Sequence, residues 1–309
     1  SGLVGSEMCI RDSMYTMGKH VKQFEEAFAE KFGSENAVMV NSGSSANLLM
    51  LSLLKWKYKL TGERTGERKA NIIVPVVGWA TTYFPIVQNG FKINFVDVDP
   101  NTWNIDVNKI KEAITPYTCA VMPVNLLGNS CDYAKLIEIC RENNLLFLVD
   151  AAQTAGIIPI DMSTSHIDLL ACPGHKSLLG PTGIGLLLIG DRASLSPWRE
   201  GGTGTHSENP RQPKELPYLL ESGTPNTLGI AGLRAGMQFI IREGFDKIRS
   251  HDQKLLSQLV TMLVEKKECQ LYGSLDIDQR VGSLAINWKN YCLLYTSPSP
   301  RDQRGSGMA

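Results

Sequence analysis

The sequence has no net charge and no long apolar run, and both absences exclude classes of protein. Its 309 residues include 31 basic and 31 acidic side chains, so no excess of positive charge indicates binding to nucleic acid. Apolar stretches such as 184–189 are far shorter than the roughly 20 residues that cross a membrane. We therefore expect a globular, cytoplasmic protein that binds neither nucleic acid nor membranes.

The sequence also lacks any cysteine pattern that is typical of metal sites or redox pairs. Its seven cysteines include no C-x-x-C pair. Two of them, Cys9 and Cys292, lie near the two ends of the chain. The others are expected to be reduced thiols, and no metal site is expected: Cys119, Cys131, Cys140, Cys172 and Cys269.

The two ends of the chain resemble translated DNA adapter. Back-translation of residues 3–13 yields an oligonucleotide whose reverse complement encodes residues 292–301. Opposite strands of one oligonucleotide do not encode two natural termini by coincidence, so 1–13 and 292–309 are interpreted as scars and left out of the fold argument. The remainder, 14–291, is expected to be a fragment, because an adapter marks a cut in the DNA and not the end of a gene.

Strand and helix patterns alternate along the chain, which predicts an α/β fold with a largely parallel sheet and helices on both faces. Seven strands are expected at 37–40, 72–76, 93–98, 120–124, 146–149, 169–172 and 185–189, and helices at 21–32, 46–56, 80–88, 107–113, 133–143 and 227–242. Residues 61–69 and 200–216 are expected to be loops. From 248 onward, a helical pattern and a strand-like 282–286 suggest the start of a smaller second domain.

Two segments at the ends of neighbouring apolar runs suggest pyridoxal phosphate chemistry. Asp150 follows one run, and Lys176 lies in a glycine-rich turn after the next. A lysine can hold the cofactor aldehyde as a Schiff base, and a carboxylate can keep the pyridine nitrogen protonated. Each residue alone is weak evidence, because strand-end aspartates and turn lysines are common. Together they predict a cofactor site where open α/β sheets place their ligands.

Two further segments are candidates for contacts with the same cofactor. The turn 41–47 (NSGSSAN) precedes an apolar helix, and its free amides predict phosphate binding by Ser44 and Ser45. A plain helix cap is the alternative for these serines. Trp79 could cover one face of the cofactor ring or could equally be a core tryptophan.

Four segments of the first part of the chain are specific motifs, namely 40–49 (VNSGSSANLL), 79–82 (WATT), 95–99 (FVDVD) and 123–128 (PVNLLG). With them, about 17–130 resembles the nucleotide-sugar aminotransferase (DegT/DnrJ/StrS) family. Deoxysugar 3-dehydratase-like members are the most similar. This resemblance implies a nucleotide-sugar substrate.

The later part of the chain has four other specific segments, namely 150–156 (DAAQTAG), 174–181 (GHKSLLGP), 200–204 (EGGTG) and 221–227 (ESGTPNT). With them, about 145–288 resembles the class V aminotransferase and cysteine desulfurase family. Both families share fold-type I of the pyridoxal phosphate enzymes. A chimera with its seam at 132–150 is therefore expected, and a natural lineage with mixed motifs is the alternative.

The two resemblances imply an architecture and a set of roles. The large domain would cover 14–247 on a seven-stranded sheet, and 248–291 would begin a truncated small domain. Asp150 would pair with the pyridine nitrogen, Gln153 with the ring hydroxyl, and His175 and Asn125 would lie near the cofactor. The parent families imply a homodimer in which Thr203 reaches the partner's site.

Departures from the families bear on the reaction. Pro173 stands three residues before Lys176, where desulfurases usually have a serine or threonine that touches the phosphate. The nucleophilic cysteine and the carboxylate-binding arginine of desulfurases should follow 289, where this chain has adapter. We therefore expect a cysteine desulfurase-type enzyme, truncated and inactive as written. The alternatives are a nucleotide-sugar aminotransferase or dehydratase, and a folded fragment without turnover.

Overall fold

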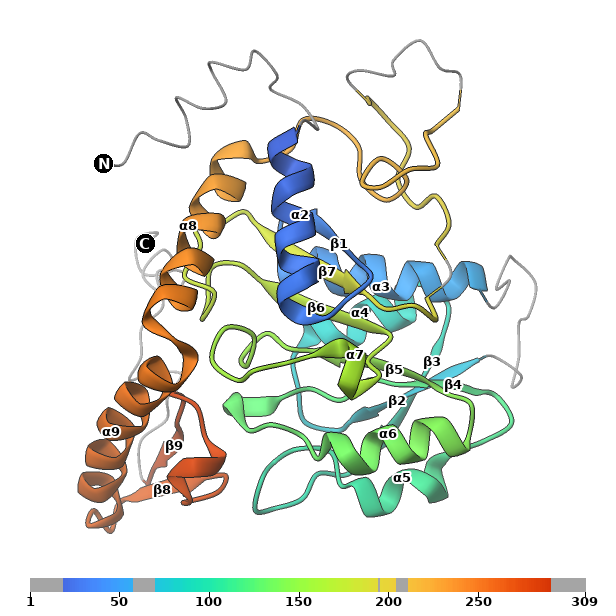
Figure 1. Ribbon diagram of the computed structural model, residues 1–309. Helices are drawn as coiled ribbons and strands as arrows, with labels where there is room; N and C mark the ends of the chain where they lie inside the picture. Colours follow the sequence, from blue (N-terminus) through green and yellow to red (C-terminus); the bar gives the residue numbers. More distant parts are fainter. Residues whose placement is uncertain (1–18, 58–69, 194, 204–210, 290–309) are drawn as a thin grey trace, which may run out of the picture.

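The computed structural model describes residues 19–57, 70–193, 195–203 and 211–289 (Figure 1). The seven strands of its main sheet are β1 (Asn36–Val40), β2 (Asn71–Pro75), β3 (Lys92–Val96), β4 (Thr118–Val121), β5 (Leu146–Asp150), β6 (Leu169–Pro173) and β7 (Gly185–Ile189). The helices that pack on it are α2 (Lys19–Phe32), α3 (Gly43–Lys57), α4 (Ala80–Gln88), α5 (Val107–Ala113), α6 (Tyr133–Glu142), α7 (Met162–Ser165) and α8 (Thr227–Glu243). The α/β architecture predicted from the sequence is confirmed.

The strands are ordered β1-β7-β6-β5-β4-β2-β3 across the sheet. The pairs β2–β3, β2–β4, β4–β5 and β5–β6 are parallel. Strand β7 is antiparallel to both of its neighbours, β1 and β6. The sheet is therefore mostly parallel, and the carboxyl ends of its parallel strands lie along one edge.

Two apolar layers cover the two faces of the sheet. Side chains alternate along each strand, so Phe147 and Val149 belong to one layer while Leu146 and Leu148 belong to the other. Helices α3 and α4 close the second layer, and α2, α5, α6 and α8 close the first. All five residues of β5, β6 and β7 are buried, which is why these strands were recognisable as continuous apolar runs.

Several element boundaries differ from those expected. Strand β4 ends at Val121 and not at 124, because Pro123 has no amide hydrogen to continue the ladder. Helix α3 begins at Gly43, three residues before the expected start, where the Ser42 side chain accepts a hydrogen bond from the Ser45 amide at 3.2 Å. Both changes concern the carboxyl edge of the sheet.

The last described elements form a separate unit beside the main sheet. Helix α9 (Phe245–Val264) is followed by the antiparallel pair β8 (Cys269–Tyr272) and β9 (Ala285–Trp288), with a short 3-10 helix, η2 (Ile277–Gln279), between them. Strand β8 was not expected, and β9 begins three residues later than the expected strand. The start of a small second domain at 248 and the seam at 132–150 both stay predictions. The segments interpreted as scars lie outside the described residues.

Candidate cofactor site at the carboxyl edge of the sheet

Asp150 ends β5 with its side chain held in a defined orientation. The residue is 4% exposed. Its Oδ2 accepts hydrogen bonds from Asn47 Nδ2 and from Thr82 Oγ1, each at 2.9 Å, and its Oδ1 accepts one from the Ala152 amide at 3.1 Å. A carboxylate oxygen can accept two hydrogen bonds, so Oδ1 retains room for a further donor.

Lys176 lies in a compact turn after β6, the strand next to β5. Asp150 is paired with Ala171 in the sheet, so the turn that holds Lys176 leaves the same edge. The amide of Gly180 donates to the Gly174 carbonyl at 2.8 Å, which closes the turn around the half-buried Lys176. His175 is exposed beside it.

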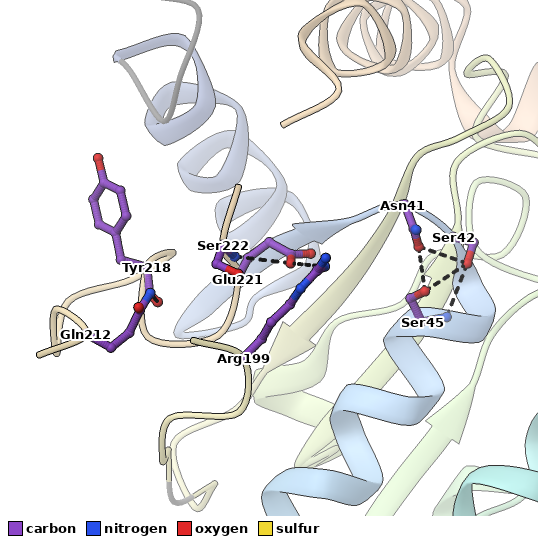
Figure 2. Close-up of polar contacts among 8 residues, drawn as sticks. All are labelled: Asn41, Ser42, Ser45, Arg199, Gln212, Tyr218, Glu221 and Ser222. Carbon is purple, nitrogen blue, oxygen red and sulfur yellow. Dashed lines mark hydrogen bonds and ion pairs between the residues drawn. The ribbon is translucent and has the colours of Figure 1, made fainter. Parts of the chain in front are cut away.

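The amino end of α3 meets the end of β6. A Cβ atom on Gly43 would lie 3.1 Å from the backbone nitrogen of Pro173, so these two segments are in close contact. Figure 2 shows the start of α3, where Ser45 Oγ donates to Asn41 Oδ1 at 2.5 Å. Ser44 is exposed and Ser45 half-buried. The predicted phosphate-binding turn therefore lies beside the segment that carries Lys176.

Trp79 and Gln153 lie on the segments that flank Asp150. Trp79 is the residue before α4 and is 59% exposed, which excludes the alternative of a core tryptophan. Its carbonyl accepts a hydrogen bond from the amide of Thr82, the same residue whose hydroxyl reaches Asp150. Gln153 is half-buried in the turn after β5.

Asn125 and Thr203 are buried, and the polar atoms of Asn125 are already engaged. Asn125 is 1% exposed, and its Nδ2 donates to Tyr133 Oη and Thr154 Oγ1, each at 2.7 Å. Its Oδ1 accepts from the Cys131 amide at 3.1 Å. These contacts show how Asn125 holds the loop after β4. Thr203 is 7% exposed, at the end of a described loop segment.

Asn47 and Thr82, the two side chains that donate hydrogen bonds to Asp150, had no role predicted from the sequence. Both lie within segments that were recognised, but their partner is distant in the chain. One available signal was a polar residue, Asn47, inside the apolar helix pattern, because a buried amide needs hydrogen-bond partners. Thr82 offered no comparable signal.

A second polar cluster lies near the start of α3 and contains two buried carboxyl groups. Glu221 accepts from Arg199 Nη1 at 2.8 Å, as Figure 2 shows, and Glu25 accepts from the Met39 amide at 2.9 Å. Burial raises the pKa of Glu25 to about 8, with a further contribution from the charge of Glu221 and partial opposition from the Met39 hydrogen bond. A cavity of about 330 Å³ lies between residues 39–41 and 221–226, with Arg199 in its wall.

The buried cysteines lack the properties of reactive thiols. Burial raises the pKa of Cys119, Cys140 and Cys172 to about 12, and that of Cys131 further. Because the thiolate is the nucleophile, these groups are unreactive near neutral pH. Cys269 is half-buried. Within the described ranges, no three His, Cys, Asp or Glu side chains are grouped so that they could hold a metal ion.

A model of the family described as aminotransferase class-V matches residues 9–293. The chain belongs to this family. The match begins within the segment interpreted as an amino-terminal scar and spans the predicted seam. Class-V aminotransferases depend on pyridoxal phosphate and act on small-molecule substrates. None of the helices within the described residues is long and apolar enough to cross a membrane.

Relatives of two kinds share sequence with this class-V chain. A GDP-4-keto-6-deoxy-D-mannose 3-dehydratase from Yersinia pseudotuberculosis is 46% identical over 147 residues, which are 48% of this chain and 36% of that protein. A probable cysteine desulfurase from Pyrococcus abyssi is 34% identical over 209 residues, 65% of this chain and 51% of that protein. The chain thus spans about one third to one half of the curated relatives it matches.

The desulfurase similarity is not confined to the second part of the class-V chain. Residues 145–309 make up little more than half of the sequence, so an alignment that covers 65% of it includes residues before the predicted seam. Among solved structures, the apo cysteine desulfurase from Thermococcus onnurineus NA1 is similar in fold. It has a TM-score of 0.72 and 24% identity, and the match covers 88% of this chain and 68% of that one.

Proposed function

We propose that this chain binds pyridoxal 5'-phosphate at the carboxyl edge of the main sheet, as part of an enzyme of the cysteine desulfurase type. The observation that carries the proposal is the convergence of three segments there. Asp150 ends β5, the turn of Lys176 follows β6, and the start of α3 contacts Pro173. The available groups fit the cofactor. Asp150 Oδ1 has an acceptor position for the ring nitrogen, and the Lys176 amine suits the aldehyde. The free amides at the start of α3 suit the phosphate.

Each of these groups has a distinct task. When bound, the cofactor supplies a ring that accepts electrons from the substrate. Lys176 Nζ would hold the aldehyde carbon and carry the proton that the substrate loses. Asp150 Oδ1 would accept the hydrogen bond from the ring nitrogen. The Ser44 and Ser45 amides would hold the phosphate, and Ser42 Oγ must turn away before the Ser45 amide is free to do so.

The remaining candidates have supporting roles in the same proposal. Trp79 is exposed beside the segment that contacts Asp150 and could cover the ring. Gln153 lies in the turn that follows Asp150 and would contact the ring hydroxyl. His175 precedes Lys176 and would lie near the cofactor. The engaged amide of Asn125 makes direct contact less favourable and indicates that it supports the loop instead.

Covalent trapping tests the cofactor assignment. The purified chain is incubated with pyridoxal phosphate, reduced with borohydride and digested, and the modified lysine is located by mass spectrometry. We expect a pyridoxyl group on Lys176, a visible absorption band before reduction, and loss of both in Lys176→Ala. Lys254→Ala, which removes an exposed lysine on α9, is the control. Modification of other lysines with an unchanged band in Lys176→Ala would refute the assignment.

Substrate and turnover can be separated from cofactor binding. Sulfur removal needs a positioned thiolate. Because four of the five native cysteines are buried with a raised pKa, we expect no sulfide release from L-cysteine above that of free cofactor. Sulfide release that depends on any of these five would contradict this expectation.

The second candidate is a nucleotide-sugar dehydratase or aminotransferase, which the 46% identity to the Yersinia protein favours. Spectral change of the bound cofactor with a GDP-linked 4-keto sugar, and none with cysteine, would support it. A homodimer in the cytoplasm is the expected setting for either activity. Thr203 is buried within its own chain, which offers little support for its reaching a partner's site.

A further inference from the structure

One oxygen of Asp150 receives hydrogen bonds from two different helices. Asn47 lies in α3 and Thr82 in the first turn of α4, and both donate to Oδ2 at 2.9 Å. Asn47 is 3% exposed and Thr82 is fully buried. Hydrogen bonds to a charged group from buried donors are stronger than neutral ones, so this arrangement fixes the plane of the carboxylate.

The orientation of the Asn47 amide is determined by its surroundings. Its Nδ2 also donates to the Thr81 carbonyl at 3.3 Å, so the nitrogen faces two acceptors. Rotating the amide by half a turn would place its oxygen against both. In the present orientation Oδ1 is buried without a hydrogen-bond partner among the described residues. An unpaired buried acceptor is unfavourable, so the contact with Asp150 is kept at the expense of another hydrogen bond.

The two carboxylate oxygens of Asp150 differ in how many hydrogen bonds they accept. Oδ2 is occupied by Asn47 and Thr82, whereas Oδ1 has a single donor, the Ala152 amide. We infer that Asn47 and Thr82 are positioning residues, which hold Asp150 so that Oδ1 is presented to the ring nitrogen of the cofactor. This inference rests on the proposed function.

The supporting helices are joined at a second point away from Asp150. Ser52 of α3 donates to Asn89 Oδ1 at 3.0 Å, at the carboxyl end of α4. This buried contact links the same two helices without touching Asp150. Ser52→Ala therefore separates the general packing of α3 on α4 from the specific hold on the carboxylate.

Affinity for pyridoxal phosphate, measured by titration of the visible band, tests the inference. In Thr82→Val a methyl group replaces the hydroxyl at nearly constant volume. In Asn47→Leu two methyl groups take the places of the amide oxygen and nitrogen, again at similar volume. We expect each variant to lower the affinity at least about tenfold, because each removes a hydrogen bond to a charged group. Thr82→Ser keeps the hydroxyl and should stay within about threefold of the wild type. Ser52→Ala should do likewise, even where its thermal midpoint falls.

The possible outcomes distinguish the two proposals. Absence of binding by the wild-type chain would remove both the proposed function and this inference. Wild-type binding that Asp150→Asn weakens but Thr82→Val and Asn47→Leu do not would overturn this inference alone. Equal losses in Ser52→Ala and Thr82→Val would also overturn it, since helix packing would then explain the effect. Rescue by Thr82→Ser, together with an unaffected Ser52→Ala, would support it.

Discussion

Replacing Glu25 with glutamine should change how the stability of this chain depends on pH. Glu25 is 6% exposed in α2, and its Oε1 accepts a hydrogen bond from the amide of Met39 in β1. Burial, with a smaller contribution from Glu221, raises the pKa of Glu25 from 4.5 to about 8. The folded chain therefore holds a proton at neutral pH. Glutamine offers the same acceptor to Met39 and cannot ionise.

The size of the effect follows from this raised pKa. Between pH 4.5 and about 8, the folded chain keeps a proton that the unfolded chain releases. The stabilisation from this proton is complete below pH 4.5. It declines as the pH rises above 4.5 and is fully lost once the pH has passed through about 8. The free energy of unfolding of the wild type should therefore fall by up to about 1.4 kcal/mol per pH unit in this window. Glu25→Gln lacks this loss, so from pH 5 to 8 it should gain about 3.5 kcal/mol relative to the wild type, because the slope is smaller near each pKa.

Urea unfolding followed by circular dichroism at pH 5, 6, 7 and 8 measures this difference. Glu26→Gln is the matched control, because Glu26 is the neighbouring glutamate and is exposed. Glu26→Gln loses a surface contact with Lys22 at 3.8 Å and a charge that is the smallest of the causes of the raised pKa of Glu25. The control should follow the wild type within a few tenths of a kcal/mol, about the value of such a pair. If the curves of Glu25→Gln and the wild type stay parallel from pH 5 to 8, the assignment of a buried protonated Glu25 is wrong.

Two further predictions concern a glycine contact and the thiols. Gly156 has a φ of 97°, and a Cβ atom there would lie 2.5 Å from the Ser177 carbonyl oxygen. Gly156→Ala should therefore lower the free energy of unfolding by about 2 to 5 kcal/mol. It should also weaken cofactor binding, because Ser177 follows Lys176. Gly90→Ala, with φ 84° and open space at the same position, is the control; an equal loss in urea unfolding would refute the steric explanation. With a thiol reagent at pH 8, peptide mapping should find Cys269 labelled first among the five cysteines that the structure describes. Equally fast labelling in the native state would contradict the raised pKa of the other four, Cys119, Cys131, Cys140 and Cys172.

The sequence alone indicated the main elements of the fold. Strands buried on both faces are short continuous apolar runs, so β5, β6 and β7 were recognised within one residue of their observed bounds. Helices α4 and α5 were predicted at their observed residues, because apolar positions at helical spacing define them. Strand β8 was missed, since its residues are only partly buried and its pattern is weak.

Strand order depends on tertiary structure. The position of β7 between β1 and β6, antiparallel to both, is determined by contacts between segments far apart in the chain. A local pattern states that a strand exists and which residues alternate, but not which strand is its neighbour.

In the candidate site too, some residues could be predicted from the sequence, whereas their contacts depend on the tertiary structure. Asp150 and Lys176 could be selected from the sequence, because each residue type suits one part of the cofactor and each follows an apolar run. The donors to Asp150 could not, since Asn47 and Thr82 are 103 and 68 residues away from it in the chain. Similarly, only the fold shows that Asn125 uses its amide on Tyr133 and Thr154. Residue chemistry is encoded locally, whereas hydrogen-bond partners are decided by how helices and strands pack, because that packing brings distant atoms within 3 Å of each other.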